Sequence, residues 1–364
     1  MLVEVKTAIE NQLAVFTLSR EKALNSLTHS MIKTIHWHAY HWSQRDDITC
    51  FLFPMLQQKV YCAGGDIRWL YEQGKAGFHD RQMTFFADEY RLDYAMGQFS
   101  KPVVAIVDGF LIGGGMGLLM PANTIYATEK AMFAMPETGI GFFPDVGMSY
   151  RLSQCPGFTG LYLALTGQRM NAHDAHYLGL VGGVLEDDVA LQIQTMAKEN
   201  GTDKAIYQML TTALSDKSQK GEAPIALLRD RIDTVFSKGS VEEMIEALGK
   251  MSDAWAQQTL NQLNNACPLS LRVTFDLMKK VRDGDQASTY QLDHTVAYHF
   301  MRCADFYEGV RAQVIDKDKK PRWQFGQIAD IPQSVIDQFF VCPDLPLNLD
   351  YQPNLVEFER VIDS

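Results

Sequence analysis

The chain has 364 residues, of which 46% are apolar and 21% charged, so it can bury a sizeable core as one large α/β domain with an appendage or as two domains. Its formal net charge of −11 argues against a general nucleic-acid or anionic-membrane binder. No segment approaches the apolar length of a membrane span, and the N-terminus carries no secretory or transit pattern, so we expect a cytoplasmic protein.

Apolar runs separated by glycine- and proline-containing turns predict strands that alternate with helices in the first half of the chain. The expected elements, in chain order, are an antiparallel hairpin at 2–6 and 12–18, a helix to about residue 43, a strand at 50–55, a helix capped by Asp66, a helix at 81–99, strands at 103–107, 124–128 and 133–135, helices at 158–165 and 172–177, and a last strand at 181–185. Helical periodicity dominates from 189 to about 311, and a short helix is expected near 333–340. The pattern therefore predicts an α/β core at 1–200, a helical region at 201–325 and an irregular tail at 326–364.

The helix that ends near residue 43 holds three histidines, His36, His38 and His41, which raises the question of a metal site. Only His38 and His41 share a helix face, and no acid or cysteine lies nearby in the sequence, so packing is the favoured interpretation. The six cysteines show no paired metal spacing and are expected to be small buried hydrophobes. Cys62 lies beside a glycine turn, so a reactive thiol is the alternative to a packing role at this position. We therefore expect no metal.

Two glycine-rich turns stand out. The buried strand at 103–107 leads to three consecutive glycines, Gly113 to Gly115, and then to a small apolar helix; a second turn, at 63–65, also follows an apolar run. Glycine at a strand-to-helix turn lets backbone N–H groups approach a ligand with no Cβ in the way. A glycine triplet is also found in ordinary tight helix packing. Two such turns, however, can each supply one N–H to a single oxygen, which is the architecture of an oxyanion hole.

Two acids, Glu137 and Asp145, follow among glycines, prolines and phenylalanines. A carboxylate in apolar surroundings is costly, so a pair of them indicates an active site. The plain alternative is a solvated turn acid at Glu137 and a helix N-cap at Asp145, because a helix is expected to begin at Asp145.

These motifs carry a resemblance. The chain resembles the crotonase (enoyl-CoA hydratase/isomerase) superfamily in three segments: AGGDI at 63–67, GGGMG at 113–117 and MPETGIGFFPDVG at 135–147. Two segments are similar to those of its hydrolase branch: FPDVG at 143–147 and DFYEGVRAQVIDKDKKPRW at 305–323. The resemblance therefore covers most of the chain. It implies a β-β-α superhelix with C-terminal helices, and hydrolysis of a short β-hydroxyacyl-CoA thioester such as 3-hydroxyisobutyryl-CoA.

The resemblance also implies residue roles and partners. Gly65 and Gly114 would supply the oxyanion hole, Glu137 and Asp145 the catalysis, and Glu89 a contact to the acyl portion of the substrate. The acyl-CoA would be the partner, CoA being part of the substrate and no cofactor being needed, with a homo-oligomer, trimer-based or lower, as a possibility.

Three other functions compete with hydrolysis on this resemblance. Hydratases of the superfamily carry a glutamate at the position of Gly117 and typically a glycine at that of Asp145, so hydration is disfavoured. An enoyl-CoA isomerase needs mainly one base and an oxyanion hole and is the stronger alternative enzyme. A catalytically silent acyl-CoA-binding protein would have no need of Glu137 and Asp145 in an apolar pocket. Hydrolysis is therefore the favoured prediction.

Overall fold

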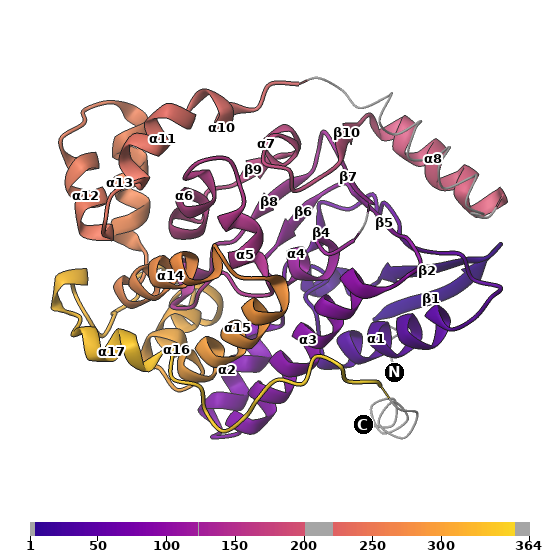
Figure 1. Cartoon of the computed structure of the whole chain (residues 1–364), viewed down its shortest axis with the longest axis horizontal. Coiled ribbons are helices and arrows are strands. Elements are labelled where there is room, and N and C mark those ends of the chain that lie inside the picture. The colour runs from indigo at the N-terminus through magenta and orange to yellow at the C-terminus, as the bar shows by residue number, and fades with distance from the viewer. Residues whose placement is uncertain (1–3, 123, 201–220, 354–364) are drawn as a thin grey trace.

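A computed structural model describes residues 4–122, 124–200 and 221–353 (Figure 1). Its strands are β1 Val5–Glu10, β2 Leu13–Leu18, β3 Cys50–Phe53, β4 Val60–Cys62, β5 Val103–Val107, β6 Phe110–Ile112, β7 Thr124–Thr128, β8 Met132–Ala134, β9 Met170–Asn171 and β10 Gly183–Leu185. Its α-helices are α1 His29–Ser43, α2 Ile67–Lys75, α3 His79–Gln98, α4 Gly114–Leu119, α5 Met148–Ser153, α6 Thr159–Thr166, α7 Ala172–Tyr177, α8 Asp187–Asn200, α10 Pro224–Leu227, α11 Arg229–Phe236, α12 Val241–Gly249, α13 Ala254–Asn265, α14 Pro268–Val281, α15 Gln286–Phe300, α16 Ala304–Val310 and α17 Gln333–Gln338.

The strands form two sheets. The larger has the order β1-β2-β3-β5-β7-β10, in which only β1 and β2 are antiparallel, and the smaller has the order β4-β6-β8-β9. Every residue of β5 is buried, which explains why this strand is a continuous apolar run without alternation. The predicted hairpin is confirmed, but β1 ends later than expected, because its turn uses Asn11 and Gln12 in left-handed conformations.

Of the smaller sheet only β8 was predicted from the sequence, as the strand expected at 133–135. Its strands β4 and β6 have only three residues each, too few to show a periodicity. They nevertheless position the glycine turns: Ala63 follows β4 directly, and Gly113 follows β6 directly. The triglycine turn therefore belongs to β6, and not to the predicted strand β5.

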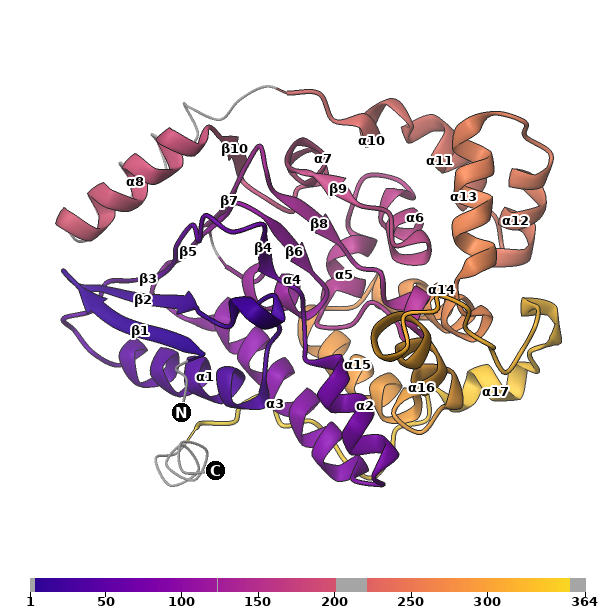
Figure 2. The ribbon, with the colours of Figure 1, turned by 180° about the vertical axis from the view of Figure 1, so that it is seen from behind.

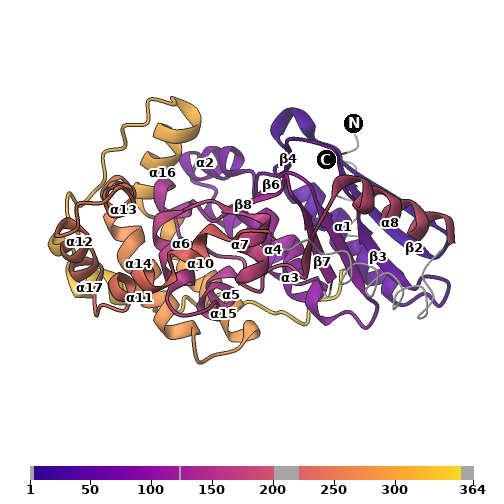
Figure 3. The same cartoon turned by 90° about the horizontal axis from the view of Figure 1, so that it is seen from above.

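Helices cover the sheets on both sides. Buried residues of the larger sheet, including Leu52 and Ile106, pack in a small core with Ala190 and Ile193 of α8. The main core joins the other sheet faces to α1, α3 and the C-terminal helices. Figure 2 shows α8 lying alongside the larger sheet, and Figure 3 shows α12, α13, α14 and α17 at the opposite end of the molecule from β1 and β2.

In the described part of the chain after Leu185, all regular elements are helical, and α17 corresponds to the helix expected at 333–340. The three-region division stays a prediction, and its residues 201–220 and 354–364 lie outside the described residues. No helix among the described residues is long and apolar enough to cross a membrane.

Candidate active site

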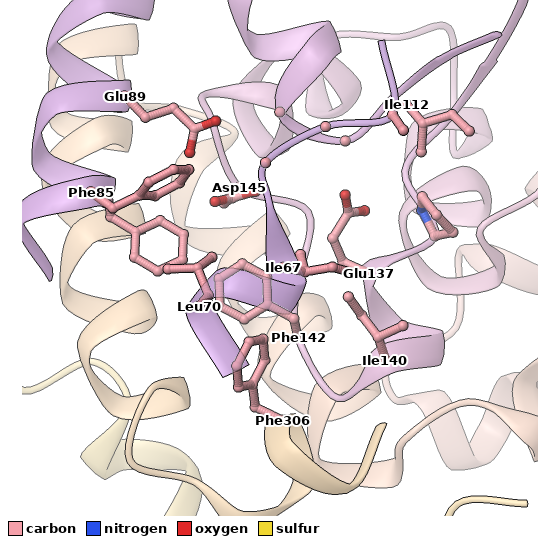
Figure 4. Close-up of a pocket in the computed structure, with 17 residues that line it drawn as sticks. Ile67, Leu70, Phe85, Glu89, Ile112, Glu137, Ile140, Phe142, Asp145 and Phe306 are labelled. Atoms are coloured by element: carbon pink, nitrogen blue, oxygen red, sulfur yellow. The ribbon is translucent and has the colours of Figure 1, made fainter. Parts of the chain in front are cut away.

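All five predicted site residues line one cavity, which is shown in Figure 4. Its walls are mostly apolar, with a few polar groups, as ligand pockets usually are. The lining consists of Ala63, Gly64, Gly65, Ile67, Leu70, Phe85, Phe86, Glu89, Ile112, Gly113, Gly114, Pro136, Glu137, Ile140, Phe142, Asp145 and Phe306.

The two glycine turns meet at this cavity. A Cβ placed on Gly64 would lie 3.1 Å from the N of Gly114, and one placed on Gly114 would lie 3.1 Å from the N of Gly65. Gly64 has a φ of +89° and Gly113 a φ of +54°, so the two turns use backbone conformations that favour glycine. Within the described residues, neither Gly65 nor Gly114 donates its backbone N–H to a hydrogen bond. Two adjacent unused donors therefore face the same cavity.

Glu137 lies three residues after the end of β8 and begins the 3-10 helix η2 at Glu137–Ile140. Its side chain is buried, and its Oε1 would lie 2.7 Å from a Cβ on Gly113, which places the carboxyl against the triglycine turn. No group of the described chain hydrogen-bonds its Oε2. Burial, and then the charge of Asp145, raise the pKa of Glu137 well above its usual value. Both causes favour the protonated form of Glu137.

Asp145 has a donor that sequence analysis missed. The hydroxyl of Tyr90, on α3, donates a hydrogen bond of 2.6 Å to its Oδ2. Burial raises the pKa of Asp145 to about 7, while the Tyr90 hydrogen bond acts in the opposite direction. Asp145 therefore titrates near neutrality. Nothing in the sequence singled out Tyr90 except its place beside Glu89.

The alternative reading of Asp145 as a helix N-cap is wrong, and so is the expected start of a helix at this residue. Helix α5 begins at Met148 with Gly147 as its N-cap, and no side chain caps it. The left-handed conformations of Val146 (φ 54°) and Gly147 (φ 72°) turn the chain between Asp145 and the helix. The carboxylate is consequently directed to Tyr90 and into the cavity, and not to the helix terminus.

Two carboxyls of α3 lie against two glycines of α4. A Cβ on Gly114 would lie 2.5 Å from Oε1 of Glu89, and a Cβ on Gly117 would lie 2.6 Å from Oδ2 of Asp93. Both acids are buried, and neither oxygen of Asp93 has a hydrogen-bond partner among the described residues. Burial is the main reason why the pKa of each acid is raised well above its usual value. The charge of Asp145 raises the pKa of Glu89 further, and the charges of Glu89 and Asp145 raise that of Asp93 further. The four-residue spacing of Glu89 and Asp93 was the available sequence signal for this pair.

The described residues hold no group of three or more His, Cys, Asp or Glu side chains arranged for a metal ion. The Nδ1 atoms of His38 and His41 each lie 2.8 Å from a carbonyl oxygen of their own helix, at Thr34 and Trp37. Burial lowers the pKa of His36 to about 4. These local hydrogen bonds and the burial of His36 favour the packing interpretation of these histidines, and the absence of a metal stays a prediction.

The thiol of Cys62 is fully buried, and its Sγ donates to the carbonyl oxygen of Asn25. Burial raises its pKa to about 12. A reactive thiolate is therefore disfavoured.

Adjacent backbone donors beside buried carboxyls are an arrangement found in enzymes that act on acyl carbonyl groups. The chain belongs to the enoyl-CoA hydratase/isomerase family, whose model matches residues 13–340. It is 37% identical over 336 residues to the protein named 3-hydroxyisobutyryl-CoA hydrolase, mitochondrial, of Danio rerio, covering 90% of this chain and 86% of that protein. The identically named human protein is 35% identical over 335 residues, with 90% and 85% coverage.

Solved structures confirm the predicted crotonase-type fold. A carnitinyl-CoA dehydratase from Mycobacterium thermoresistibile aligns with a TM-score of 0.89 and 29% identity, over 96% of this chain and 99% of its own. An enoyl-CoA hydratase from Rhodobacter sphaeroides aligns with a TM-score of 0.88 and 28% identity, over 95% of this chain and all of its own.

Proposed function

We propose that this chain hydrolyses 3-hydroxyisobutyryl-CoA to 3-hydroxyisobutyrate and free CoA, a step of valine catabolism. The observation that carries the proposal is the convergence of the unused N–H groups of Gly65 and Gly114 with Glu137 and Asp145 in one cavity. The names of the curated relatives, which this chain matches over most of its length, support the choice of substrate.

In this proposal the thioester oxygen accepts hydrogen bonds from Gly65 N and Gly114 N. As the carbonyl carbon becomes tetrahedral, negative charge gathers on that oxygen, and each donor lowers the barrier by about 3 kcal/mol. The two donors cost no reorganisation, because the turns already hold them together.

The two acids share the proton transfers. Asp145, with its pKa of about 7 and its Tyr90 donor, holds the negative charge and acts as base. Glu137, whose raised pKa favours its protonated form, gives its proton to the leaving thiolate. The proton that Asp145 takes comes from a water molecule, which attacks the carbonyl carbon and supplies the hydroxyl of the new acid. The C–S bond breaks after this attack, as Glu137 protonates the thiolate. The alternative in which Glu137 attacks as a carboxylate and forms an anhydride is distinguished by single turnover in ¹⁸O-labelled water, since only that route places ¹⁸O in Glu137.

Glu89 suits the recognition of a β-hydroxyl group. Its carboxyl lies against Gly114 at the edge of the cavity, and Oε1 has no partner within the described residues. Burial raises the pKa of Glu89 and so favours its protonated form, which can both donate to and accept from a hydroxyl. An unsaturated acyl chain would leave this buried group unpaired, which favours the hydroxylated substrate.

Hydration of a double bond fits the site less well. A side chain at residue 117 would place its Cβ 2.4 Å from Cβ of Val146 and 2.6 Å from the Asp93 carboxyl, so this position has no room for a second catalytic glutamate. An isomerase would need only one base, whereas the cavity offers both Glu137 and Asp145. A silent binding protein would gain nothing from burying either acid.

The proposal is tested by free-thiol release from 3-hydroxyisobutyryl-CoA, 3-hydroxypropionyl-CoA and crotonyl-CoA. We expect thiol release from the two hydroxyacyl thioesters and little change in the conjugated absorbance of crotonyl-CoA. Rapid loss of that absorbance without thiol release would assign a hydratase instead. Binding of all three without any turnover would assign a silent acyl-CoA-binding protein.

The proposed reaction consumes only water and the thioester, so it requires no cofactor. A homo-oligomer, trimer-based or lower, stays a prediction that light scattering would check. The cytoplasmic location also stays a prediction, and the curated relatives are named as mitochondrial proteins.

A further inference from the structure

Asp293 is a buried acid that the proposed chemistry does not use. It lies in the middle of α15, in the helical part of the chain that follows the α/β core, and its exposed fraction is 0%. It is the one Asp, Glu, Lys or Arg in the sequence of this helix. Burial of a carboxyl is costly unless its oxygens are engaged in hydrogen bonds, so its partners indicate why an acid stands at this position.

Both oxygens of Asp293 accept hydrogen bonds from the turn that follows Asp145. Its Oδ2 accepts from the N of Gly147 at 2.8 Å, and its Oδ1 accepts from the Oγ of Ser149 at 3.3 Å. Gly147 and Ser149 are themselves buried, so water cannot replace Asp293 as their acceptor without movement of the chain. Asp293 therefore holds the turn at two points just beyond Asp145.

This turn needs support because Val146 is in a left-handed conformation, with a φ of 54°. That conformation is unfavourable for a β-branched residue, and it persists where the surrounding structure holds it. On one side Val146 packs on α4, where a Cβ placed on Gly117 would lie 2.4 Å from its Cβ. On the other side α15 meets the next residue, since a Cβ placed on Gly147 would lie 2.8 Å from Cζ of Tyr290. The unfavourable conformation is thus held between two helices.

The same helix also supports the hydrogen-bond donor of Asp145. Helix α15 packs on both α3 and α5 (Figure 1). The ring centroid of Tyr90 lies 6.0 Å from that of Tyr290 and 6.5 Å from that of His294. Tyr290, Asp293 and His294 share one face of α15, because they are spaced three and one residues apart. This face therefore contacts both the turn that carries Asp145 and the tyrosine that donates to it.

We propose that Asp293 is a positioning residue for Asp145, an inference that rests on the proposed function. By holding Gly147 and Ser149, it keeps Val146 in its left-handed conformation and so directs the Asp145 carboxylate to Tyr90 and into the cavity. Without Asp293 the turn relaxes to a more favourable backbone conformation, and the base moves relative to the thioester and the attacking water. A displacement of about 1 Å can lower a catalytic rate by about a hundredfold.

The test compares Asp293→Ala with Asp293→Asn in the full chain, by thiol release from 3-hydroxyisobutyryl-CoA, with kcat expressed per folded protein. Alanine removes both acceptors. Asparagine keeps an acceptor oxygen for the N of Gly147, and its amide group can donate to the Oγ of Ser149. We expect Asp293→Ala to lower kcat about ten- to a hundredfold while KM changes by less than about twofold, and Asp293→Asn to recover most of the loss.

Asp174→Ala is the matched control. Asp174 is also buried and accepts two hydrogen bonds, from the N of Asn171 at 3.1 Å and from the N of Ile225 at 2.8 Å, but it does not line the cavity. This variant should lower the melting temperature about as much as Asp293→Ala does, yet keep the wild-type kcat per folded protein. An equal loss of kcat in the two alanine variants would assign Asp293 a role in stability alone.

Two further results would overturn the proposal. Wild-type kcat in Asp293→Ala would show that the turn keeps its conformation without the acid. An asparagine variant as slow as the alanine variant would show that the charge of residue 293 matters, and not its hold on the turn.

Amide hydrogen exchange of the segment 145–149, followed by mass spectrometry, needs no turnover. We expect faster exchange in Asp293→Ala than in the wild type, Asp293→Asn and Asp174→Ala, because the N–H of Gly147 loses its acceptor. Unchanged exchange in Asp293→Ala refutes the hold. A wild type that releases no thiol from any thioester would end the proposed function, and the exchange measurement would then decide by itself whether Asp293 holds the turn of Asp145.

Discussion

The Tyr90 hydroxyl is the group whose removal tests the active-site electrostatics most directly. It donates at 2.6 Å to Asp145, a fully buried carboxyl whose pKa is about 7. A hydrogen bond to a charged group contributes about 1.5–3 kcal/mol, and 1.36 kcal/mol corresponds to one pKa unit. Because the bond stabilises the ionised carboxylate, Tyr90→Phe should raise the Asp145 pKa by about 1–2 units.

We expect the acidic limb of the pH profile of kcat/KM to shift to higher pH in this variant. At pH 7 about half of the Asp145 side chains are ionised in the wild type, from its pKa of about 7. In Tyr90→Phe this fraction falls to roughly one tenth to one hundredth, so kcat/KM at pH 7 should drop about five- to fiftyfold. The loss should be recovered at higher pH, because the variant still ionises there.

The assay is kcat/KM for 3-hydroxyisobutyryl-CoA between pH 5.5 and 9.5, roughly two units around that pKa, with free CoA measured by chromatography. Tyr94→Phe is the matched control, since it removes a hydroxyl one turn further along α3 while keeping the ring that packs on Tyr290. The ring of residue 90 also stays in contact with Phe86 and Tyr290. A Tyr90→Phe profile that superimposes on the wild type would refute Asp145 as the base.

Four further outcomes are expected. Glu137→Gln and Asp145→Asn should each lower kcat by about a hundredfold or more, the double variant should lose little beyond either single one, and acyl-CoA binding by calorimetry should persist. Gly114→Ala should lower kcat about a hundredfold in a folded protein, because the new Cβ would lie 3.1 Å from the N of Gly65; unchanged turnover would make the turn merely structural. The excess in melting temperature of Asp93→Asn over the wild type, by calorimetry, should grow by at least about 2 °C as the pH rises from about 4 to about 8, because a buried carboxyl with a raised folded pKa loses stability once the pH passes its unfolded value of about 4. Crotonyl-CoA should not be hydrated even at high enzyme concentration, which its absorbance would show, since Gly117 supplies no second carboxylate.

Much of the fold follows from local sequence. The run at β5 is entirely buried and apolar, and the structure gives it the predicted bounds, Val103–Val107. The N-cap of α2 was also predicted correctly, since Asp66 accepts a hydrogen bond from the N of Trp69. These features depend on residues within one element, so periodicity and capping chemistry are enough to predict them.

Only part of the candidate site could be predicted from residues within single elements. The glycine turns and the acids were recognisable because glycine runs and carboxyls in apolar segments are unusual in any sequence. The adjacency of Gly65 and Gly114, however, depends on the pairing of β4 with β6, two strands too short to predict.

Tertiary structure alone decided the electrostatics of the site. Asp145 has the form of an N-cap in the sequence, yet the left-handed conformation of Val146 turns it toward Tyr90, which lies 55 positions earlier in the chain. Asp93 has the form of a surface charge on a helix, yet it is buried because Gly117 on α4 leaves room for it. A pKa depends on burial and on charges that lie close in space, and neither is determined until distant elements pack together.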